Sequence, residues 1–421
     1  MIDFKSISEE CVKCGKCIPT CTIHTANPDE VTSPRGFLEL LGAYDRGDLD
    51  LDKNAKNIFE SCFLCTNCVD VCPNTLPIDA MIENVRADIA KKYGIAFYKR
   101  AFFWFLRHRF FMDLASKLGY IFQTCGFKIK DELNSMQPRF SLPMIKKDRL
   151  LPSLGSKSFL NSHPPIIENG GEGKVGIFIG CLANYNYTDI GEGLLEIFKA
   201  LKIDVYLLKK QACCGAPAYF TGDFDTVDIL ARKNIAYFKE VLKDLDAIVI
   251  PEATCSAMIK EDYPHFFDLR DESLSKDMKE LNKKIFMATE YLEKHTDLKN
   301  LLAKKQKQTD LITYHDPCHA RKMQGIYKEP RSLLSQNYKL KEMSDPNACC
   351  GFGGVTIQAE KHHLAKTIGD KKAQMIDQTK AKYVSAECSA CKMQITNSLF
   401  QNKSEVLFKN PIELIAEALR D

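Results

Sequence analysis

The sequence predicts a multidomain protein of the α+β class, in which a helical domain with two groups of cysteines precedes a duplicated α/β domain. Three observations support this fold class. The spacing C-x2-C-x2-C-x3-C occurs twice before residue 73. A second series of cysteines recurs later at a nearly constant offset, which is typical of an internal repeat. Around that series, short apolar runs alternate with helical patterns, as in a parallel α/β layer.

The composition is that of an ordinary globular protein. The chain has 421 residues, 45% of them hydrophobic, and a net charge of +3. This length predicts about three domains, and the near balance of charge gives no electrostatic reason to expect nucleic acid binding. The first residues carry no export signal, and no run reaches the ~18 apolar residues of a membrane span. We therefore expect a cytoplasmic protein, soluble or peripheral on the inner face of the membrane.

The chain contains 18 cysteines. Without an export signal, such a number argues against a disulfide framework and favours metal binding. Zinc needs four ligands in a closed tetrahedron, whereas three cysteines at two-residue spacing, with a fourth three residues later, suit a 4Fe–4S cluster. In two-cluster ferredoxins the fourth cysteine ligates the other cluster. The predicted ligands are Cys11, Cys14, Cys17 and Cys72 for one cluster, and Cys62, Cys65, Cys68 and Cys21 for the other. Zinc and disulfides remain the alternatives.

The first domain is predicted to span residues 1–95 as a helical two-cluster ferredoxin domain. The segment between the two motifs is longer than a minimal ferredoxin needs, and it shows helical periodicity around Phe37, Leu40 and Leu41. The segment PIDAMIENVRADIAKKYG after the second motif also has a helical pattern.

Residues 96–173 are predicted to connect the domains. The stretch 97–122 interleaves aromatic and basic residues, among them Phe103, Trp104, Arg107 and Phe110. An amphipathic basic helix of this kind binds an anionic membrane surface or a partner. The alternative is a helix that packs two domains together. Residues 134–173 are rich in Pro, Ser and Gly, which predicts an extended linker.

The remaining chain is predicted to contain two repeats, residues 174–308 and 309–421. The first contains Cys181, Cys213, Cys214 and Cys255, and the second contains Cys318, Cys349, Cys350, Cys388 and Cys391. Taken in order, the first four positions of each set are offset by 137, 136, 136 and 133 residues. This alignment places Met258 opposite Cys391, so a thioether would stand where the second repeat has a thiolate.

The context of these cysteines repeats as well. KVGIFIGC and DLITYHDPC are apolar runs that end at a cysteine, and QACCGAPA and NACCGFGG are glycine turns. We therefore expect the cysteines at the carboxyl ends of parallel strands, where open α/β sheets bind ligands.

These motifs resemble known proteins. SPRG and CFLCTNCVDVCPNTLPIDAMIENVR are similar to the iron–sulfur subunit of glycolate oxidase and its lactate-utilisation relatives, and the layout is similar to the iron–sulfur subunit of anaerobic glycerol-3-phosphate dehydrogenase. The first domain resembles the ferredoxin-like subunit of heterodisulfide reductase, and the repeated C…CCG…C pattern resembles the cysteine-rich (CCG) domains found in another subunit of that enzyme. The resemblance implies a noncubane 4Fe–4S cluster on the five cysteines of the second repeat. The first repeat would hold a four-thiolate cluster or be a vestigial scaffold.

The resemblance also implies a function. The chain would be the electron-transfer subunit of a multi-subunit dehydrogenase, passing electrons from an FAD-dependent partner, which oxidises a 2-hydroxy acid such as glycolate or lactate, toward quinone. The chain itself has no flavin, nicotinamide or nucleotide fingerprint, so we expect an oxidoreductase subunit without its own substrate-oxidising flavin. One alternative is a heterodisulfide reductase-like thiol–disulfide or quinone reductase with the noncubane cluster as its catalytic centre. Another is an iron–sulfur scaffold or sensor.

Polar residues flank Cys318 in the segment YHDPCHARK. His315, Asp316, His319 and Arg321 either tune a cluster or handle a proton near it. The alternative is a turn in which Asp316 and Pro317 open a helix.

Overall fold

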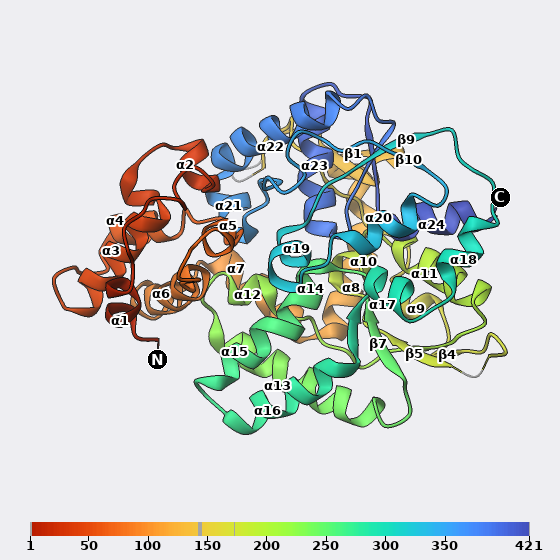
Figure 1. The fold of residues 1–421 in the computed structure, drawn as a ribbon, viewed down its shortest axis with the longest axis horizontal. Helices are drawn as coiled ribbons and strands as arrows, with labels where there is room; N and C mark the ends of the chain where they lie inside the picture. Colours follow the sequence, from red (N-terminus) through yellow and green to blue (C-terminus); the bar gives the residue numbers. More distant parts are fainter. Residues whose placement is uncertain (1, 142–144, 172, 421) are drawn as a thin grey trace.

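The N-terminal domain is built from short helices around two cysteine-bearing loops (Figure 1, red and orange). The structure, a computed structural model, describes residues 2–141, 145–171 and 173–420. The helices of this domain are α1 (Phe4–Glu9), α2 (Thr22–Ala26), η1 (Glu30–Thr32), α3 (Pro34–Asp45), α4 (Lys53–Phe59), α5 (Asn67–Asp70) and α6 (Ile78–Tyr93).

Helix α3 shows how the sequence sets these elements. The side chain of Ser33 accepts a hydrogen bond from the Gly36 amide and Pro34 occupies the first turn, which together start the helix. A side chain at Gly36 would lie 2.0 Å from the carbonyl oxygen of Glu30, so only glycine fits there. Phe37 and Leu41 then face the core of the domain, as the periodicity predicts.

The basic-aromatic stretch forms two helices, α7 (Phe97–Arg107) and α8 (Arg109–Gly126), which break at His108. Phe103 is buried in the core of the first repeat, so its prediction as a surface residue is wrong. Trp104 and Phe110 are 41% and 72% exposed. The stretch therefore has both features: one face packs between domains and the other faces outward. No helix in the described part of the chain is long and apolar enough to cross a membrane.

The segment predicted as an extended linker contains short strands. Strands β1 (Phe127–Lys130), β2 (Ser135–Pro138) and β3 (Leu151–Pro152) form an antiparallel sheet. The short elements around them are η2 (Asp131–Leu133), α9 (Phe159–Ser162) and β4 (Ile166–Ile167).

The first repeat contains a five-stranded sheet in the order β4-β6-β5-β7-β8, parallel except for β4. Its other strands are β5 (Lys174–Ile177), β6 (Asp204–Leu207), β7 (Ala247–Ile250) and β8 (Ile285–Met287). Its helices are α10 (Cys181–Tyr185), α11 (Asp189–Ala200), α12 (Ala216–Tyr219), α13 (Phe224–Val241), α14 (Ala253–Ala257), η3 (Met258–Asp262), α15 (Tyr263–Asp268), α16 (Glu272–Leu281), η4 (Asn282–Lys284), α17 (Ala288–Lys294) and α18 (Leu298–Ala303).

The second repeat contains a four-stranded parallel sheet in the order β10-β9-β11-β12. Its strands are β9 (Leu311–Tyr314), β10 (Lys339–Leu340), β11 (Tyr383–Ser385) and β12 (Leu407–Lys409). Its helices are α19 (Cys318–Gln324), α20 (Lys328–Leu334), α21 (Gly354–Glu360), α22 (His362–Asp377), α23 (Ser389–Gln401) and α24 (Pro411–Arg420).

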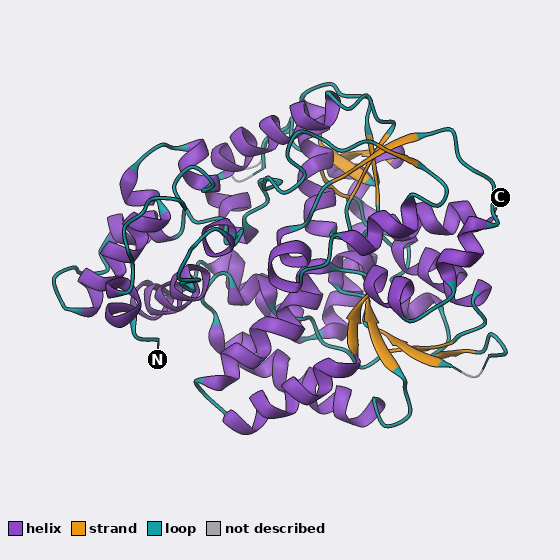
Figure 2. Ribbon diagram, in the orientation of Figure 1, coloured by secondary structure: helices purple, strands orange, loops and turns teal. Residues whose placement is uncertain are grey.

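The two repeats share one hydrophobic core. Val175 and Ile177 of the first sheet lie in the same buried cluster as Ile312 and Tyr314 of the second. Helix α24 packs on α11, and together they close the end of this core away from the N-terminal domain (Figure 1). Figure 2 shows the two sheets as separate layers surrounded by helices. The multidomain α+β class is thereby confirmed.

Candidate metal centres

The first group of cysteines comes from both motifs. Cys11, Cys14 and Cys17 line one hollow together with Cys72, the last cysteine of the second motif. Lys13 and Gly15 adopt left-handed backbone conformations, which curl the loop so that its thiols face one space. Cys14 is exposed, so this site lies at the surface.

The second group shows the reciprocal crossing. Cys62, Cys65 and Cys68 line a second hollow with Cys21, the last cysteine of the first motif. The structure thus brings together the two sets that the spacing predicts. The assignment of these thiols as cluster ligands stays a prediction.

The spread of the thiols indicates what each hollow fits. A zinc ion bound to four sulfurs at 2.3 Å holds those sulfurs ~3.8 Å apart. Among the described residues, the only group of three His, Cys, Asp or Glu ligand atoms within 4.8 Å of one another is His315, Cys350 and Cys391. The cysteines of the two N-terminal groups are therefore too far apart for a single ion, and they suit a larger cluster.

The second group is enclosed, and its thiols need a cation. Burial raises the pKa of Cys21 to about 12 and that of Cys62 to about 11. The thiolate forms that ligate iron are thus unfavourable in this space unless positive charge is bound there. Arg86 closes the site, since its guanidinium donates to the Cys62 carbonyl at 2.7 Å and to the Phe220 carbonyl at 2.9 Å.

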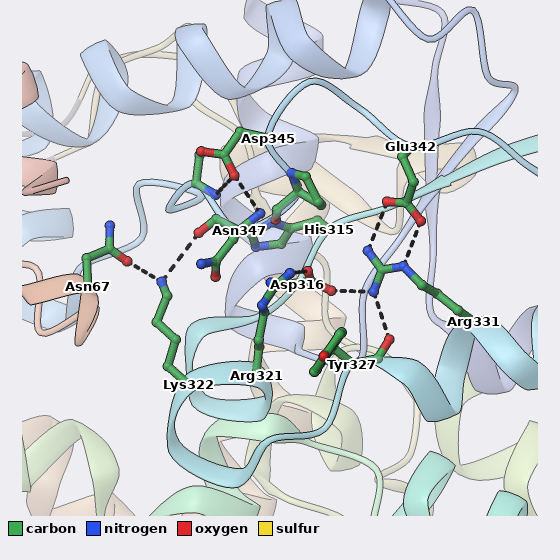
Figure 3. Close-up of polar contacts among 12 residues, drawn as sticks. Asn67, His315, Asp316, Arg321, Lys322, Tyr327, Arg331, Glu342, Asp345 and Asn347 are labelled. Atoms are coloured by element: carbon green, nitrogen blue, oxygen red, sulfur yellow. Dashed lines mark hydrogen bonds and ion pairs between the residues drawn. The ribbon is translucent and has the colours of Figure 1, made fainter. Parts of the chain in front are cut away.

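The second group also adjoins the second repeat. The thiol of Cys65 makes a hydrogen-bonded contact with the thiol of Cys349, which together with burial raises the pKa of Cys65. Lys322 spans the same junction (Figure 3): its ammonium group contacts the Asn67 side chain and lies 3.3 Å from the Asn347 carbonyl oxygen. The two domains therefore meet where their cysteines meet.

The second repeat brings its five cysteines to the carboxyl ends of strands β9 and β11. The Sγ atoms of Cys350 and Cys391 lie 3.4 Å apart. Hydrogen bonds from Cys349 and Cys391 lower the pKa of Cys350 to about 5, so one thiolate of this set is already favoured. Gly351 turns the chain with a φ of +90° and approaches the Ala365 carbonyl. The remaining members of the set, at the starts of α19 and α23, are Cys318 and Cys388.

The first repeat places four cysteines in the equivalent positions. Their thiols contact one another as a chain, from Cys181 to Cys213, then Cys214, then Cys255. Gly180 precedes this site, and a side chain there would lie 3.1 Å from the sulfur of Cys255.

The sheet registers correct the predicted alignment of the repeats. Val175 pairs with Ala247 in the first sheet, and Ile312 pairs with Tyr383 in the second. The chain from Ala247 to Cys255 is therefore equivalent to the chain from 383 to 391, at an offset of 136 residues.

Cys255 is thus the counterpart of Cys391, and the prediction that Met258 stands in this position is wrong. The contact of Cys255 with Cys214 matches the contact of Cys391 with its own Cys-Cys-Gly turn. The residue missing from the first repeat is the counterpart of Cys388, and Glu252 occupies that place. Each of these two residues directly precedes the helix that carries the next cysteine.

Glu252 binds the other repeat. Its carboxylate accepts hydrogen bonds from the Ser389 amide at 2.8 Å and from the Ser389 hydroxyl. Glu387 reciprocates by accepting from the Thr289 amide at 3.2 Å. Burial raises the pKa of both carboxyls to about 8. The lost thiol has therefore been replaced by an acceptor that caps α23.

The polar residues around Cys318 separate into different roles (Figure 3). Asp316 is buried and forms ion pairs with Arg321 and Arg331, which fixes the turn and makes it structural. His319 lies 3.3 Å from the Thr254 hydroxyl and stacks on Phe220 at a junction between domains. The ring of His315 lies with Cys350 and Cys391.

A group of buried carboxyls was not predicted from the sequence. Asp79 and Glu83 of α6 lie near Asp262 of the first repeat. Burial raises the pKa of Asp262 to about 7, and one of its oxygens has no hydrogen-bond partner among the described residues. No sequence signal could have revealed this group, because its members are separated by nearly 180 residues.

A basic cavity of about 160 Å³ opens at the first repeat. Cys181 and Cys213 lie in its wall, as do Arg107, Lys210 and Lys233. The cationic side chains favour an anionic visitor near these thiols.

Comparison with known proteins agrees with this arrangement. Residues 7–76 match the family described as "4Fe-4S dicluster domain", and residues 175–260 and 312–396 both match "Cysteine-rich domain". An uncharacterised iron–sulfur protein of Methanococcus maripaludis is 30% identical over 417 residues, which cover 96% of this chain and 70% of the relative.

Two relatives carry functional names. A fumarate reductase (CoM/CoB) subunit of Methanothermobacter marburgensis is 29% identical over 422 residues, covering 98% of this chain and 72% of the relative. The probable glycolate oxidase iron–sulfur subunit of Bacillus subtilis is 27% identical over 403 residues, covering 91% and 87%. With its cysteines grouped as described, the chain belongs to the family of iron–sulfur proteins that join a 4Fe–4S dicluster domain to two cysteine-rich domains, a family whose named members include iron–sulfur subunits of oxidoreductases.

Proposed function

We propose that the chain is the electron-transfer subunit of a multi-subunit dehydrogenase. It would receive electrons from an FAD-dependent partner that oxidises a 2-hydroxy acid such as glycolate or lactate, and pass them toward quinone. The observation that carries this proposal is the contact between Cys65 and Cys349. This contact joins the second ferredoxin site to the second repeat, so the cysteine groups form one continuous series from the exposed Cys14 inward.

The residues present fit the cofactors of such a series. The two crossed groups of the N-terminal domain would each hold a 4Fe–4S cluster, and the five cysteines of the second repeat would hold a further, noncubane 4Fe–4S cluster. The four cysteines of the first repeat would hold at most a four-thiolate cluster. Bound clusters supply the one-electron chemistry, while the chain spaces them and excludes water.

The partners are proposed from the exposed surfaces. Val12 is 62% exposed beside the first ferredoxin site, which offers the flavoprotein a direct approach to it. The outer face of α7 and α8 exposes Trp104, Phe110 and Phe122. Such a face suits a peripheral contact with the inner membrane surface or with a membrane-bound subunit, in keeping with a cytoplasmic location.

The test uses the protein with and without its partners. Purified alone and anaerobically, the chain should accept electrons from dithionite but should not oxidise glycolate or lactate with a dye acceptor. Isolated from its native cells, it should carry a flavoprotein with it. Substrate oxidation by the isolated chain would contradict the subunit assignment.

The basic cavity at Cys181 and Cys213 favours a second candidate, a heterodisulfide reductase-like thiol–disulfide reductase or quinone reductase. Its cationic wall would admit an anionic disulfide to the first repeat. If the dithionite-reduced chain transfers electrons to an anionic disulfide, and Lys233→Ala and Arg107→Ala slow this transfer, this candidate is favoured over simple electron relay.

A further inference from the structure

The imidazole of His315 has an unusual environment. The residue directly follows β9 and is 1% exposed. Its Nε2 atom has no hydrogen-bond partner among the described residues. One ring nitrogen and the Sγ atoms of Cys350 and Cys391 all lie within 4.8 Å of one another. A buried polar atom without a partner is costly, so its function requires an explanation.

The other ring nitrogen fixes the tautomer. Nδ1 of His315 lies 3.1 Å from the carbonyl oxygen of Pro346. A carbonyl oxygen only accepts, so Nδ1 carries the hydrogen. Burial and the nearby charge of Lys372 lower the pKa of the ring, which keeps it neutral. Nε2 therefore presents a bare lone pair to the cysteines.

Thiolates and sulfides cannot satisfy this lone pair, since they are hydrogen-bond acceptors themselves. When Cys350 and Cys391 are deprotonated to bind metal, three electron-rich atoms would face one another. Only a cation between them removes the repulsion. Neutral imidazole is an established nitrogen ligand of iron, including in iron–sulfur centres, and the Pro346 carbonyl orients the ring as an outer partner would.

We propose that Nε2 of His315 is a direct ligand of the metal centre of the second repeat, in addition to its thiolates. This proposal rests on the proposed function, which places a centre there. The second repeat would then bind metal through a mixed nitrogen and sulfur donor set.

The first repeat provides an internal comparison. The Phe178 amide donates to the Val249 carbonyl at 3.0 Å, and the His315 amide donates to the Ser385 carbonyl at 2.9 Å. Phe178 is thus the counterpart of His315, and it cannot ligate a metal. The second repeat therefore exceeds the first by two donors, His315 and the cysteine that replaces Glu252.

The experiment is pulsed electron paramagnetic resonance on the full chain, purified anaerobically and poised at a series of potentials. The signal of the second repeat is identified as the one that Cys350→Ser removes. We expect a directly bound ¹⁴N coupling on this signal, which converts to a ¹⁵N coupling when histidine alone is ¹⁵N-labelled. His315→Phe should abolish the coupling, while His319→Phe should retain it and both ferredoxin signals should remain.

Each other outcome overturns a defined statement. A second-repeat signal without histidine nitrogen coupling, or with coupling that persists in His315→Phe, overturns the ligand assignment alone. If no signal depends on Cys350, the proposed centre itself is wrong. If His315→Phe loses the centre altogether, the labelled wild type and His319→Phe decide: histidine coupling retained in His319→Phe supports the proposal, and its loss there overturns it.

Discussion

The thiol of Cys65, in the N-terminal domain, contacts the thiol of Cys349, in the second cysteine-rich repeat. These residues are separated by 284 positions. Their contact makes the second repeat the direct neighbour of the buried ferredoxin site. Over the described part of the chain, the thiols of the first repeat contact one another instead, which gives the two repeats different places in an electron pathway.

This relationship predicts an asymmetric effect of two matched substitutions. Cys349→Ser should slow the reduction of the second-repeat centre by the ferredoxin clusters or remove that centre. Cys213→Ser, at the equivalent position of the first repeat, should leave this step unchanged. Stopped-flow reduction monitored by absorbance measures both. Equal slowing by the two substitutions would contradict the proposed order.

Crossed ligation predicts which cluster each terminal cysteine supports. Cys72→Ser should damage the cluster of the first motif, and Cys21→Ser that of the second, because each thiol lines the other motif's hollow. Each variant should lose up to about four of about eight ferredoxin iron atoms. Iron analysis and paramagnetic spectra measure the loss, and a variant that disturbs only its own motif's cluster would overturn the crossing.

Position 252 should control the first repeat, and position 258 should not. Glu252→Cys restores the fifth thiol beside Cys255 and should alter the metal content or spectrum of this repeat. Met258→Cys lies outside the set and serves as the control. A spectral change in the Met258 variant alone would restore the alignment that the sheet registers exclude.

The carboxyl of Asp262 predicts a pH-dependent stability. Burial raises its pKa to about 7, with the charges of Asp79 and Glu261 adding to the shift and His319 opposing it. Its contribution is fully present below the ordinary pKa of aspartate and is lost as pH rises through about 7. Relative to Asp262→Asn, wild type should thus lose up to about 2 kcal/mol between pH 5.5 and 7.

Thermal unfolding of the intact protein at several pH values measures this difference. Asp225→Asn, at the exposed start of α13, is the matched control. Parallel pH profiles for wild type and the Asp262 variant would show that this carboxyl keeps an ordinary pKa.

The face of α7 and α8 can be tested with residues of opposite exposure. Trp104→Ser and Phe110→Ser should weaken membrane or partner association with iron content unchanged, since both side chains point outward. Phe103→Ser should instead destabilise the fold by about 3 kcal/mol or more, because that ring is buried. Flotation with anionic vesicles and co-purification report association, and unchanged binding in the exposed variants would leave this face without a partner.

Local spacing predicted much of the molecule. The groupings of Cys11 and Cys62 with their neighbours depend on a few residues of tight loop, and the offset between Cys181 and Cys318 is visible in the sequence alone. Strand ends also followed from apolar runs that stop at cysteines. These features are encoded within short segments, so a single sequence contains them.

The remaining features depend on tertiary contacts. The mistaken place of Met258 arose because two cysteines of the second repeat, 388 and 391, compete for one partner in the first. Only the pairing of Val175 with Ala247 resolves this choice. The hydrogen bond that fixes the tautomer of His315 likewise involves a carbonyl 31 residues away, which no motif specifies.

The bond between Glu252 and Ser389 constrains how the duplicated halves can evolve. Once the carboxylate capped α23, a return to cysteine at position 252 would regain a thiol but leave a buried amide of the other half without an acceptor, at a cost of about 1–3 kcal/mol. Position 389 cannot change freely either, because its hydroxyl and amide satisfy that same carboxylate. The ancestral symmetry is therefore difficult to restore by single substitutions, and the two halves are inherited as one unit with divided roles.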